Sequence, residues 1–218
     1  MKLNFSDEIF PGILISFCGI DGSGKTTQIE MLSSWFKQKG YRLTKTFQPT
    51  KEVRESALFR QFVDSGEHDG LEYRSLSLIT ISDRLQHSRH FILPKLMNSE
   101  IVLTDRYYYS ALANLWARGY KNDKWIYEIA GFIPKPDIAF FMDTDFDVSL
   151  QRVRNRPNEK ERFIDVEFDN ELCRNMKQIG KESNGVFLDG EDTIENIHEA
   201  VVLHVNHALS RKLVNITH

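Results

Sequence analysis

The chain has 218 residues, of which 41% are hydrophobic and 27% are charged, and this length favours one globular α/β domain. Its 28 basic and 31 acidic residues give a formal net charge of −3, without the basic excess of a nucleic-acid-binding protein. No stretch approaches the roughly 20 apolar residues of a membrane span, so we expect neither nucleic acid nor membrane as a partner.

The first segment, residues 1–17, lacks the features of a secretory signal peptide. It has one lysine, an apolar run interrupted by acidic residues and proline, and no small-residue cleavage site. Cys18 and Cys173 lie far apart and have no metal-type spacing, which is typical of reduced thiols. We therefore expect a cytoplasmic protein without a disulfide.

Five short apolar runs alternate with longer segments of helical spacing. The predicted strands are Ile13–Cys18, Leu43–Phe47, Ile101–Thr104, Ile138–Met142 and Val186–Leu188. The predicted helices cover 25–39, about 71–97, a segment starting near 107, about 146–156, about 166–181, and 193 to about 213. Continuous apolar strands indicate a parallel sheet covered on both faces. The pattern predicts a three-layer α/β fold with a five-stranded parallel sheet, in a single domain spanning 1–218 with its core at about 13–210.

A glycine-rich segment after the first predicted strand fits the pattern G-x-x-x-x-G-K-[ST]. The candidate ATP-binding residues are Gly19, Ile20, Asp21, Gly22, Ser23, Gly24, Lys25, Thr26 and Thr27. The glycines permit backbone angles that direct successive N–H groups at phosphate oxygens, beside the positive end of the next helix. We expect Lys25 to reach the β- and γ-phosphates and the Thr26 hydroxyl to help hold Mg²⁺. A strand before and a helix after argue against a plain glycine turn.

A carboxylate, Asp105, ends the third apolar run and is followed by Arg106. The end of a buried parallel strand suits a group that holds Mg²⁺ through water. Many ATP-driven motors carry a glutamate next, to activate water, whereas an arginine is suited to gripping a second phosphate. No Asn-Lys-x-Asp string of a guanine-specific switch protein occurs. The pattern favours transfer to a phosphorylated acceptor over hydrolysis.

Further cations lie in two places. Arg84 lies inside the long predicted helix, where it either projects toward an acceptor phosphate or forms a solvated pair with Asp83. A second cluster follows the fourth strand and comprises Arg152, Arg154, Arg156 and Arg162. We expect an arginine-bearing lid at about 152–165, since donors that close over a γ-phosphoryl group neutralise its charge and exclude water. The alternative is a solvated charged helix face.

In this order the elements resemble the thymidylate kinase family. The matching segments are GIDGSGKTTQ near the start, SDRLQH in a helix, TDRYYYSALA after a strand and PKPDIAFFMD before the arginines, within about Ile13 to Ile197. The resemblance implies the P-loop NTPase fold of this family's kinases, with Mg-ATP as donor and a nucleoside monophosphate, dTMP first, as acceptor. It also implies a homodimer.

The resemblance assigns roles to individual positions. Asp21 approaches the acceptor's sugar hydroxyl, Arg84 and Arg106 clamp its phosphate, and Ser23 marks the subgroup whose lid supplies the transfer arginine. The catalytic candidates are Lys25, Asp105, Arg106, Arg154, Arg156 and Arg162. The substrate-binding candidates are Asp21, Lys51, Arg84, Arg106 and Asn114, and the metal candidates are Thr26 and Asp105.

The chain departs from the family pattern where the base binds. Thr80 stands at the position of the family's stacking aromatic residue, and Leu115 at that of a base-contacting glutamine, with Asn114 as a partial substitute. The candidate replacement rings, which are alternatively plain core residues, are Phe47, Tyr107, Tyr108, Tyr109 and Trp116. Because stacking and amide contacts select a base, these departures leave the base preference open.

Two other functions remain compatible with the residues. A nucleoside or other small-molecule kinase would share the ATP-binding loop but would not need Arg84 and Arg106 together. A regulatory nucleotide-binding protein would keep the loop and lack acceptor activity.

Overall fold

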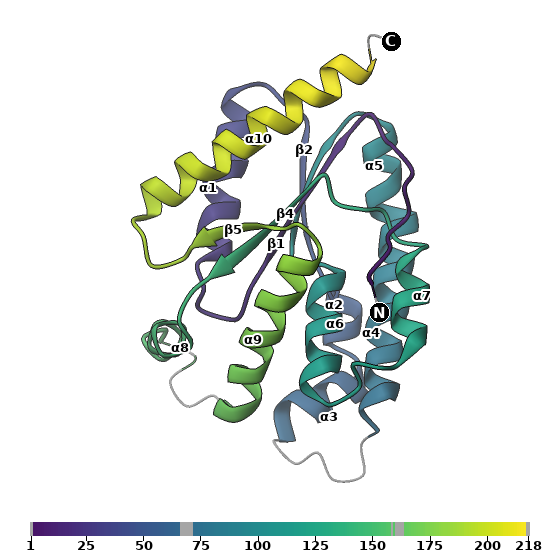
Figure 1. The fold of residues 1–218 in the computed structure, drawn as a ribbon, viewed down its shortest axis with the longest axis vertical. Coiled ribbons are helices and arrows are strands. Elements are labelled where there is room, and N and C mark those ends of the chain that lie inside the picture. Colours follow the sequence, from purple (N-terminus) through teal and green to yellow (C-terminus); the bar gives the residue numbers. More distant parts are fainter. Residues whose placement is uncertain (1, 66–71, 158, 160–163, 217–218) are drawn as a thin grey trace.

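The computed structural model describes residues 2–65, 72–157, 159 and 164–216. A five-stranded parallel sheet has helices on both faces (Figure 1), in the strand order β2-β3-β1-β4-β5. The strands are β1 (Ile13–Cys18), β2 (Leu43–Phe47), β3 (Ile101–Asp105), β4 (Ile138–Asp143) and β5 (Val186–Asp189). The predicted fold class and all five strands are confirmed. Three strands end one residue later than predicted, each on an aspartate.

The apolar side chains of the three central strands pack on both faces of the sheet. On one face, α1 (Lys25–Gln38) and α10 (Ile194–Ile216) cover a cluster that includes Phe17 and Phe140, whose ring centroids lie 4.9 Å apart. Strand β1 pairs in parallel with β3 and β4, so Ile15 lies beside both Leu103 and Ile138. This packing fixes the end of β1 from which the glycine-rich loop starts.

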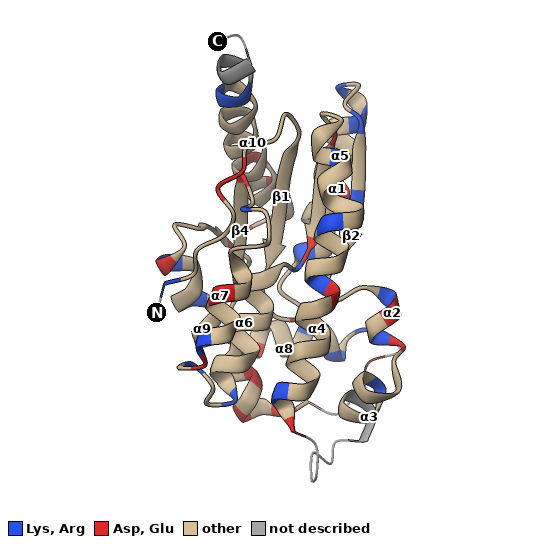
Figure 2. Ribbon diagram, turned by 90° about the vertical axis from the view of Figure 1, so that its right-hand side faces the viewer, with Lys and Arg blue, Asp and Glu red and all other residues tan. Residues whose placement is uncertain are grey.

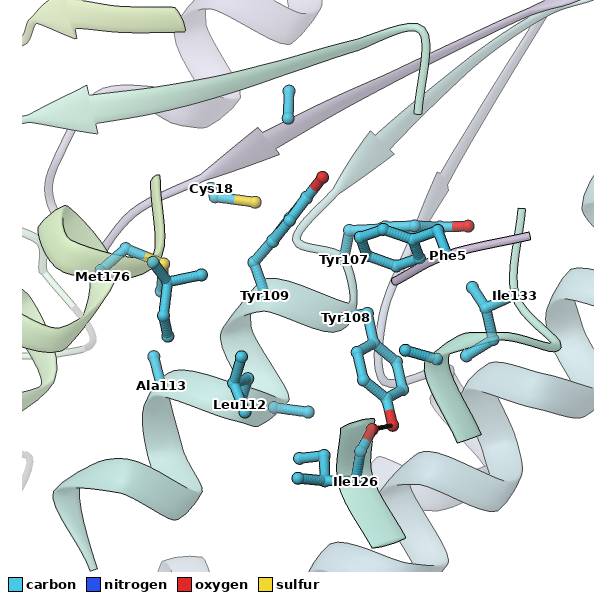
Figure 3. Close-up of a cluster of buried hydrophobic side chains, with 14 of the residues drawn as sticks. Phe5, Cys18, Tyr107, Tyr108, Tyr109, Leu112, Ala113, Ile126, Ile133 and Met176 are labelled. Atoms are coloured by element: carbon cyan, nitrogen blue, oxygen red, sulfur yellow. Dashed lines mark hydrogen bonds between the residues drawn. The ribbon is translucent and has the colours of Figure 1, made fainter. Parts of the chain in front are cut away.

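The opposite face carries α4 (Tyr73–His87), α6 (Tyr108–Ala117) and α9 (Val166–Glu182). Figure 3 shows its cluster, with three consecutive tyrosines turned into the interior. The Tyr108 hydroxyl donates to the Ile126 carbonyl at 2.6 Å, and the Tyr107 hydroxyl donates to the Pro134 carbonyl at 2.7 Å. These hydrogen bonds satisfy the buried hydroxyls, and the rings supply apolar area.

The long predicted helix at 71–97 consists of three parts. Helix α4 continues through a π-helical turn, Ser88–Ile92, into α5 (Leu93–Met97). Pro94 lacks the N–H that an α-helix would use there, and a π-helical turn just before it accommodates the missing bond. The predicted helix at 146–156 is α8 (Phe146–Arg154), which ends two residues earlier.

Three helices were not predicted, namely α2 (Lys51–Arg54), α3 (Ala57–Ser65) and α7 (Lys124–Ala130). All are short, and too few turns leave no clear apolar period. In Figure 2, α2 and α3 lie beside α4.

Within the described ranges, no helix has the length and apolarity to span a bilayer. Both thiols are free, and burial raises the pKa of Cys18 to about 12.

Candidate active site

The glycine-rich loop joins β1 to the first turn of α1 in a conformation that requires its glycines. Gly22 has φ 83° and Gly24 has φ 94°, in the left-handed region. A Cβ on Gly22 would lie 2.2 Å from the Ser149 carbonyl oxygen of α8, so a side chain cannot be placed there without moving the loop. The loop thus carries its N–H groups to the start of α1, where anions bind.

The Lys25 side chain is buried inside this loop. Its Nζ donates to the Ile20 carbonyl at 2.7 Å and lies 3.4 Å from the Ser23 hydroxyl. Burial, with a smaller contribution from the nearby Arg106, lowers the pKa of Lys25 to about 8. Burial disfavours the charged form of Lys25, and a phosphate bound beside Nζ would favour it by supplying a negative partner.

Asp105 and Thr26 line one cavity of about 400 Å³ with the loop. The Asp105 Oδ1 atom is buried and has no hydrogen-bond partner within the described residues. A carboxylate oxygen and a hydroxyl at the site of a polyphosphate suit Mg²⁺, which takes few protein ligands and fills its shell with water and phosphate oxygens. The residues present therefore fit the expected ion.

Arg106 occupies a strained position at the end of β3. Its φ is 64°, and its guanidinium donates to the Gly19 carbonyl at 3.0 Å and to Asp21 Oδ1 at 2.5 Å. Burial lowers the pKa of Arg106, but Asp21 and Asp105 more than offset this, and the net shift is upward. A left-handed non-glycine residue costs about 1–3 kcal/mol and persists where the surroundings fix it.

Two cavities meet at this arginine. The phosphate-loop cavity is the one lined by the loop, Thr26 and Asp105. The aromatic cavity has about 530 Å³ and is lined by rings from several helices, among them Phe62, Tyr73 and Phe168. The side chains of Asp21, Arg54 and Arg106 line both cavities. Two adjoining sites that share cations can hold two phosphorylated molecules end to end.

Arg84 projects into the aromatic cavity from α4. Its side chain is 3% exposed, one guanidinium nitrogen donates to the Thr80 carbonyl at 2.8 Å, and Nε is buried without a partner in the described part of the chain. Burial lowers the pKa of Arg84 to about 10. The alternative of a solvated Asp83–Arg84 face is wrong, because Asp83 instead accepts hydrogen bonds from the Thr50 N–H at 2.8 Å and the Thr50 hydroxyl at 2.5 Å.

The cation of α2 that lines both cavities is Arg54, whereas the sequence indicated Lys51. Lys51 is exposed, with Nζ 3.6 Å from Glu55, and lines neither cavity among the described residues. Arg54, one turn later on α2, lines both cavities, and its Nε donates to the Pro49 carbonyl at 2.8 Å. No motif marks Arg54. The sequence signal for Arg54 was its position three residues after Lys51, since residues three apart lie on the same face of a helix.

The replacement rings also differ from the predicted ones. Tyr107, Tyr108, Tyr109 and Trp116 are core residues, and Phe47 lies on β2 with Arg54 over its ring at 5.0 Å. Within the described ranges, none of them lines the aromatic cavity. The rings that do so are Phe59, Phe62, Tyr73, Phe146 and Phe168. They come from four helices, and only Phe59 and Phe62, three residues apart on α3, are related by a helical spacing.

The substituted base-contacting positions are placed differently from each other. Thr80 and Asn114 line the aromatic cavity, whereas Leu115 is fully buried in the core. The Asn114 amide donates to the Ser110 carbonyl at 2.8 Å, one turn earlier on α6. Its carbonyl oxygen and its second amide N–H make no other hydrogen bond among the described residues, so both can contact a ligand.

The predicted lid arginines are placed unequally. Arg156 lines the phosphate-loop cavity, whereas half-buried Arg154 is not among the described residues that line it, and Arg162 lies outside the described residues. Arg152, which the sequence placed in the lid cluster but not among the catalytic candidates, also lines this cavity and donates to the Gly190 carbonyl at 2.8 Å. Arg152 thus connects α8 to the loop after β5 beside this cavity.

Comparison with known proteins agrees with this geometry. The thymidylate kinase family model matches residues 17–201. A probable thymidylate kinase of Pyrococcus horikoshii is 34% identical over 201 residues, covering 91% of this chain and 98% of the relative. One from Pyrococcus abyssi is 32% identical over 204 residues, with the same coverage, and a thymidylate kinase of Fervidobacterium nodosum is 29% identical over 199 residues, 87% of this chain and 96% of the relative. The chain belongs to the thymidylate kinase family.

Proposed function

We propose that the protein transfers the γ-phosphoryl group of ATP to dTMP, giving ADP and dTDP. The observation that carries this proposal is the junction of two cavities at Asp21, Arg54 and Arg106. One cavity has the phosphate loop of an ATP site. The other has a buried arginine, Arg84, whose Nε has no partner among the described residues, facing a ring-lined space. A monophosphate with a planar base matches that second space in charge and in chemistry.

The chain's own residues act by position and charge. An acceptor phosphate oxygen forms a bond to the γ-phosphorus as the bond to the β–γ bridging oxygen breaks, and ADP keeps that electron pair. Lys25 and Arg106 lie where they stabilise the charge spread over the transferred group, and Arg84 with Arg54 orients the acceptor phosphate. Thr26 and Asp105 would hold Mg²⁺, which would neutralise phosphate charge on the donor. No covalent enzyme intermediate is needed.

Arg152 and Arg156 are the lid-side cations of this proposal. Both line the phosphate-loop cavity, and they lie at the end of α8 and just after it, at the start of the proposed lid at 152–165. We include Arg154 and Arg162 as candidates that add positive charge around the transferred phosphoryl group when the proposed lid closes.

We also propose that residues 1–218 form a single domain with its core at about 13–210, and that the protein is cytoplasmic.

The proposed homodimer uses the exposed face of α4 and the turns that follow it. Leu78, Ile79, Phe91 and Met97 are 37–66% exposed along this continuous helical segment. An apolar row on a helix is a typical oligomer interface. Sedimentation should give twice the chain mass, and Leu78→Asp should halve it. Leu203→Asp, at a similarly exposed leucine on α10, is the control and should leave the dimer intact.

The experiment for the activity measures ADP and nucleotide products from Mg-ATP with a panel of nucleoside monophosphates and unphosphorylated nucleosides. We expect selective conversion of dTMP and loss of activity in Lys25→Ala. Conversion of a nucleoside in preference to its monophosphate would support the nucleoside kinase alternative, and ATP binding without transfer would support the regulatory one. The comparisons favour neither alternative.

A further inference from the structure

We propose that Arg118 is a positioning residue for the acceptor base, because it holds together three aromatic rings that line the aromatic cavity. This inference rests on the proposed function and deepens it. Thr80 provides no ring at the family's stacking position, so base contact must come from other parts of the wall. The structure assigns that task to Phe62, Tyr73 and Phe168.

The three rings surround one guanidinium group. The Arg118 Cζ atom lies 4.1 Å from the Phe168 ring centroid, 5.1 Å from that of Tyr73 and 5.2 Å from that of Phe62. The Phe62 and Tyr73 centroids are themselves 5.3 Å apart. A cation within about 6 Å of a ring centroid is attracted by the negative face of the ring. Each ring therefore has a preferred position relative to the same charge.

Arg118 makes few other contacts that could explain its position. Its Nε is buried and lacks a hydrogen-bond partner, and no ion pair of its guanidinium occurs within the described residues. Its backbone N–H bonds to the Asn114 carbonyl at 3.2 Å, at the end of α6 where a cation suits the helix dipole. The contacts between the Arg118 guanidinium and the three rings thus hold the side chain in place, and the same contacts hold the rings.

The rings come from helices that are distant in sequence. Phe62 lies on α3, Tyr73 begins α4, and Phe168 lies in the first turn of α9, after the proposed lid. No strand or shared helix fixes their relative orientation. A single guanidinium between them joins the acceptor-side helices α3 and α4 to the lid-side helix α9 across the cavity.

Losing this charge would allow each ring to rotate independently. A planar base stacks well only on rings that already present a face or an edge at the right angle. We therefore expect the loss to weaken acceptor binding and base discrimination, while the ATP side, formed by other residues, is unaffected. A role limited to stability would lower the amount of folded enzyme and leave the discrimination between bases unchanged.

The test compares Arg118→Met, Arg118→Lys and Lys121→Met. Lys121 is the matched control, because its ammonium group lies 4.0 Å from the Trp116 ring, which does not line the aromatic cavity among the described residues. In Arg118→Met we expect the KM for dTMP to rise about tenfold, with kcat and the KM for ATP changed by less than twofold. The dTMP-to-dUMP ratio of kcat/KM should fall at least threefold. Arg118→Lys, which keeps a cation, should recover part of both losses.

The possible outcomes are distinguishable. If the wild-type protein converts no monophosphate, the proposed function fails and this inference falls with it. If the wild type is active and Arg118→Met behaves like Lys121→Met in dTMP KM and base ratio, only the inference about Arg118 is overturned. Should Arg118→Met not fold, Tyr73→Leu replaces it. An unchanged base ratio in Tyr73→Leu would overturn the inference in the same way.

Discussion

The substitution Arg84→Met should change the stability of this protein and its affinity for the acceptor in opposite directions. Arg84 is 3% exposed and has a buried Nε without a partner in the described residues. Its charge has been removed from water without an ion-pair partner, so it should destabilise the ligand-free fold. A methionine of similar length fills the space without that penalty. We expect the variant to be more stable than the wild type and to bind dTMP poorly.

The magnitude follows from burial of the guanidinium. The fall in the pKa of Arg84 from its ordinary value to about 10 corresponds to about 3 kcal/mol against the charged folded form. Because the folded pKa lies below the unfolded one, this cost is fully present at pH 7 and is relieved only as pH rises above about 10. Loss of the hydrogen bond to the Thr80 carbonyl reduces this gain in stability by about 1 kcal/mol. Arg84→Met should therefore gain about 1–2 kcal/mol, or roughly 2–8 °C in Tm.

Acceptor binding should change in the opposite direction. A charge-assisted hydrogen bond contributes about 1.5–3 kcal/mol, so loss of the guanidinium should weaken dTMP binding by about 100-fold. At a dTMP concentration of about 100 times the wild-type Kd, the ligand stabilises the wild type by about 2.7 kcal/mol. The same concentration would stabilise Arg84→Met by about 0.4 kcal/mol.

The assay is thermal unfolding with and without dTMP, together with steady-state kinetics in which dTMP is varied. Arg89→Met, at an exposed arginine one turn further along the same helical segment, is the control and should change neither quantity. Arg84→Met with lower stability and an unchanged KM for dTMP would refute the reasoning. Arg84 would then be a structural residue rather than a phosphate ligand.

Three further predictions test the loop and the core. Gly22→Ala should lower kcat/KM for ATP by at least about 100-fold, since its Cβ would lie 2.2 Å from a carbonyl oxygen of α8. Gly40→Ala, at φ 78° with no atom within 4 Å, should cost only about 1 kcal/mol of stability and no activity. Urea unfolding should show wild-type stability rising between pH 8 and 9.5, because the pKa of Lys25 is lowered to about 8 by burial, and Lys25→Met should lack this rise. Tyr108→Phe should cost about 1–3 kcal/mol of unfolding free energy, because the Ile126 carbonyl loses its donor at 2.6 Å.

Each of these predictions has a contrary result. Equal ATP kinetics in Gly22→Ala and Gly40→Ala would mean that the loop can move away from α8 at little cost. A pH dependence that persists in Lys25→Met would assign the titration to another group. A Tyr108→Phe protein as stable as the wild type would show that water or a shifted ring replaces the lost hydroxyl.

Much of the fold follows from local patterns in the sequence. Short runs rich in apolar residues identify all five strands. The three central strands are almost continuously apolar because both of their faces are buried, whereas the edge strands β2 and β5 are partly exposed. The glycine-rich loop is equally local, since its chemistry depends on nine consecutive residues between one strand and one helix. The short helices α2, α3 and α7 lack enough turns for a periodic signal.

The aromatic cavity could not be predicted in this way. Arg54 reaches both cavities because α2 lies beside α4, and the sequence offered Lys51 as an equally suitable cation three residues earlier. Consecutive tyrosines after β3 are conspicuous in the sequence, yet they fill the core. The rings that line the cavity are inconspicuous and are far apart along the chain.

The sequence by itself determined the sheet, the glycine-rich loop and the candidate cations Arg84 and Arg106, because each depends on neighbouring residues or on the end of one strand or helix. Only the tertiary structure decided which further cation lines both cavities and which rings line the aromatic cavity. Those choices depend on the packing of α2, α3, α4, α6 and α9 around one cavity. Side chains from separate helices meet there through long-range contacts, which leave no periodicity or spacing in the sequence.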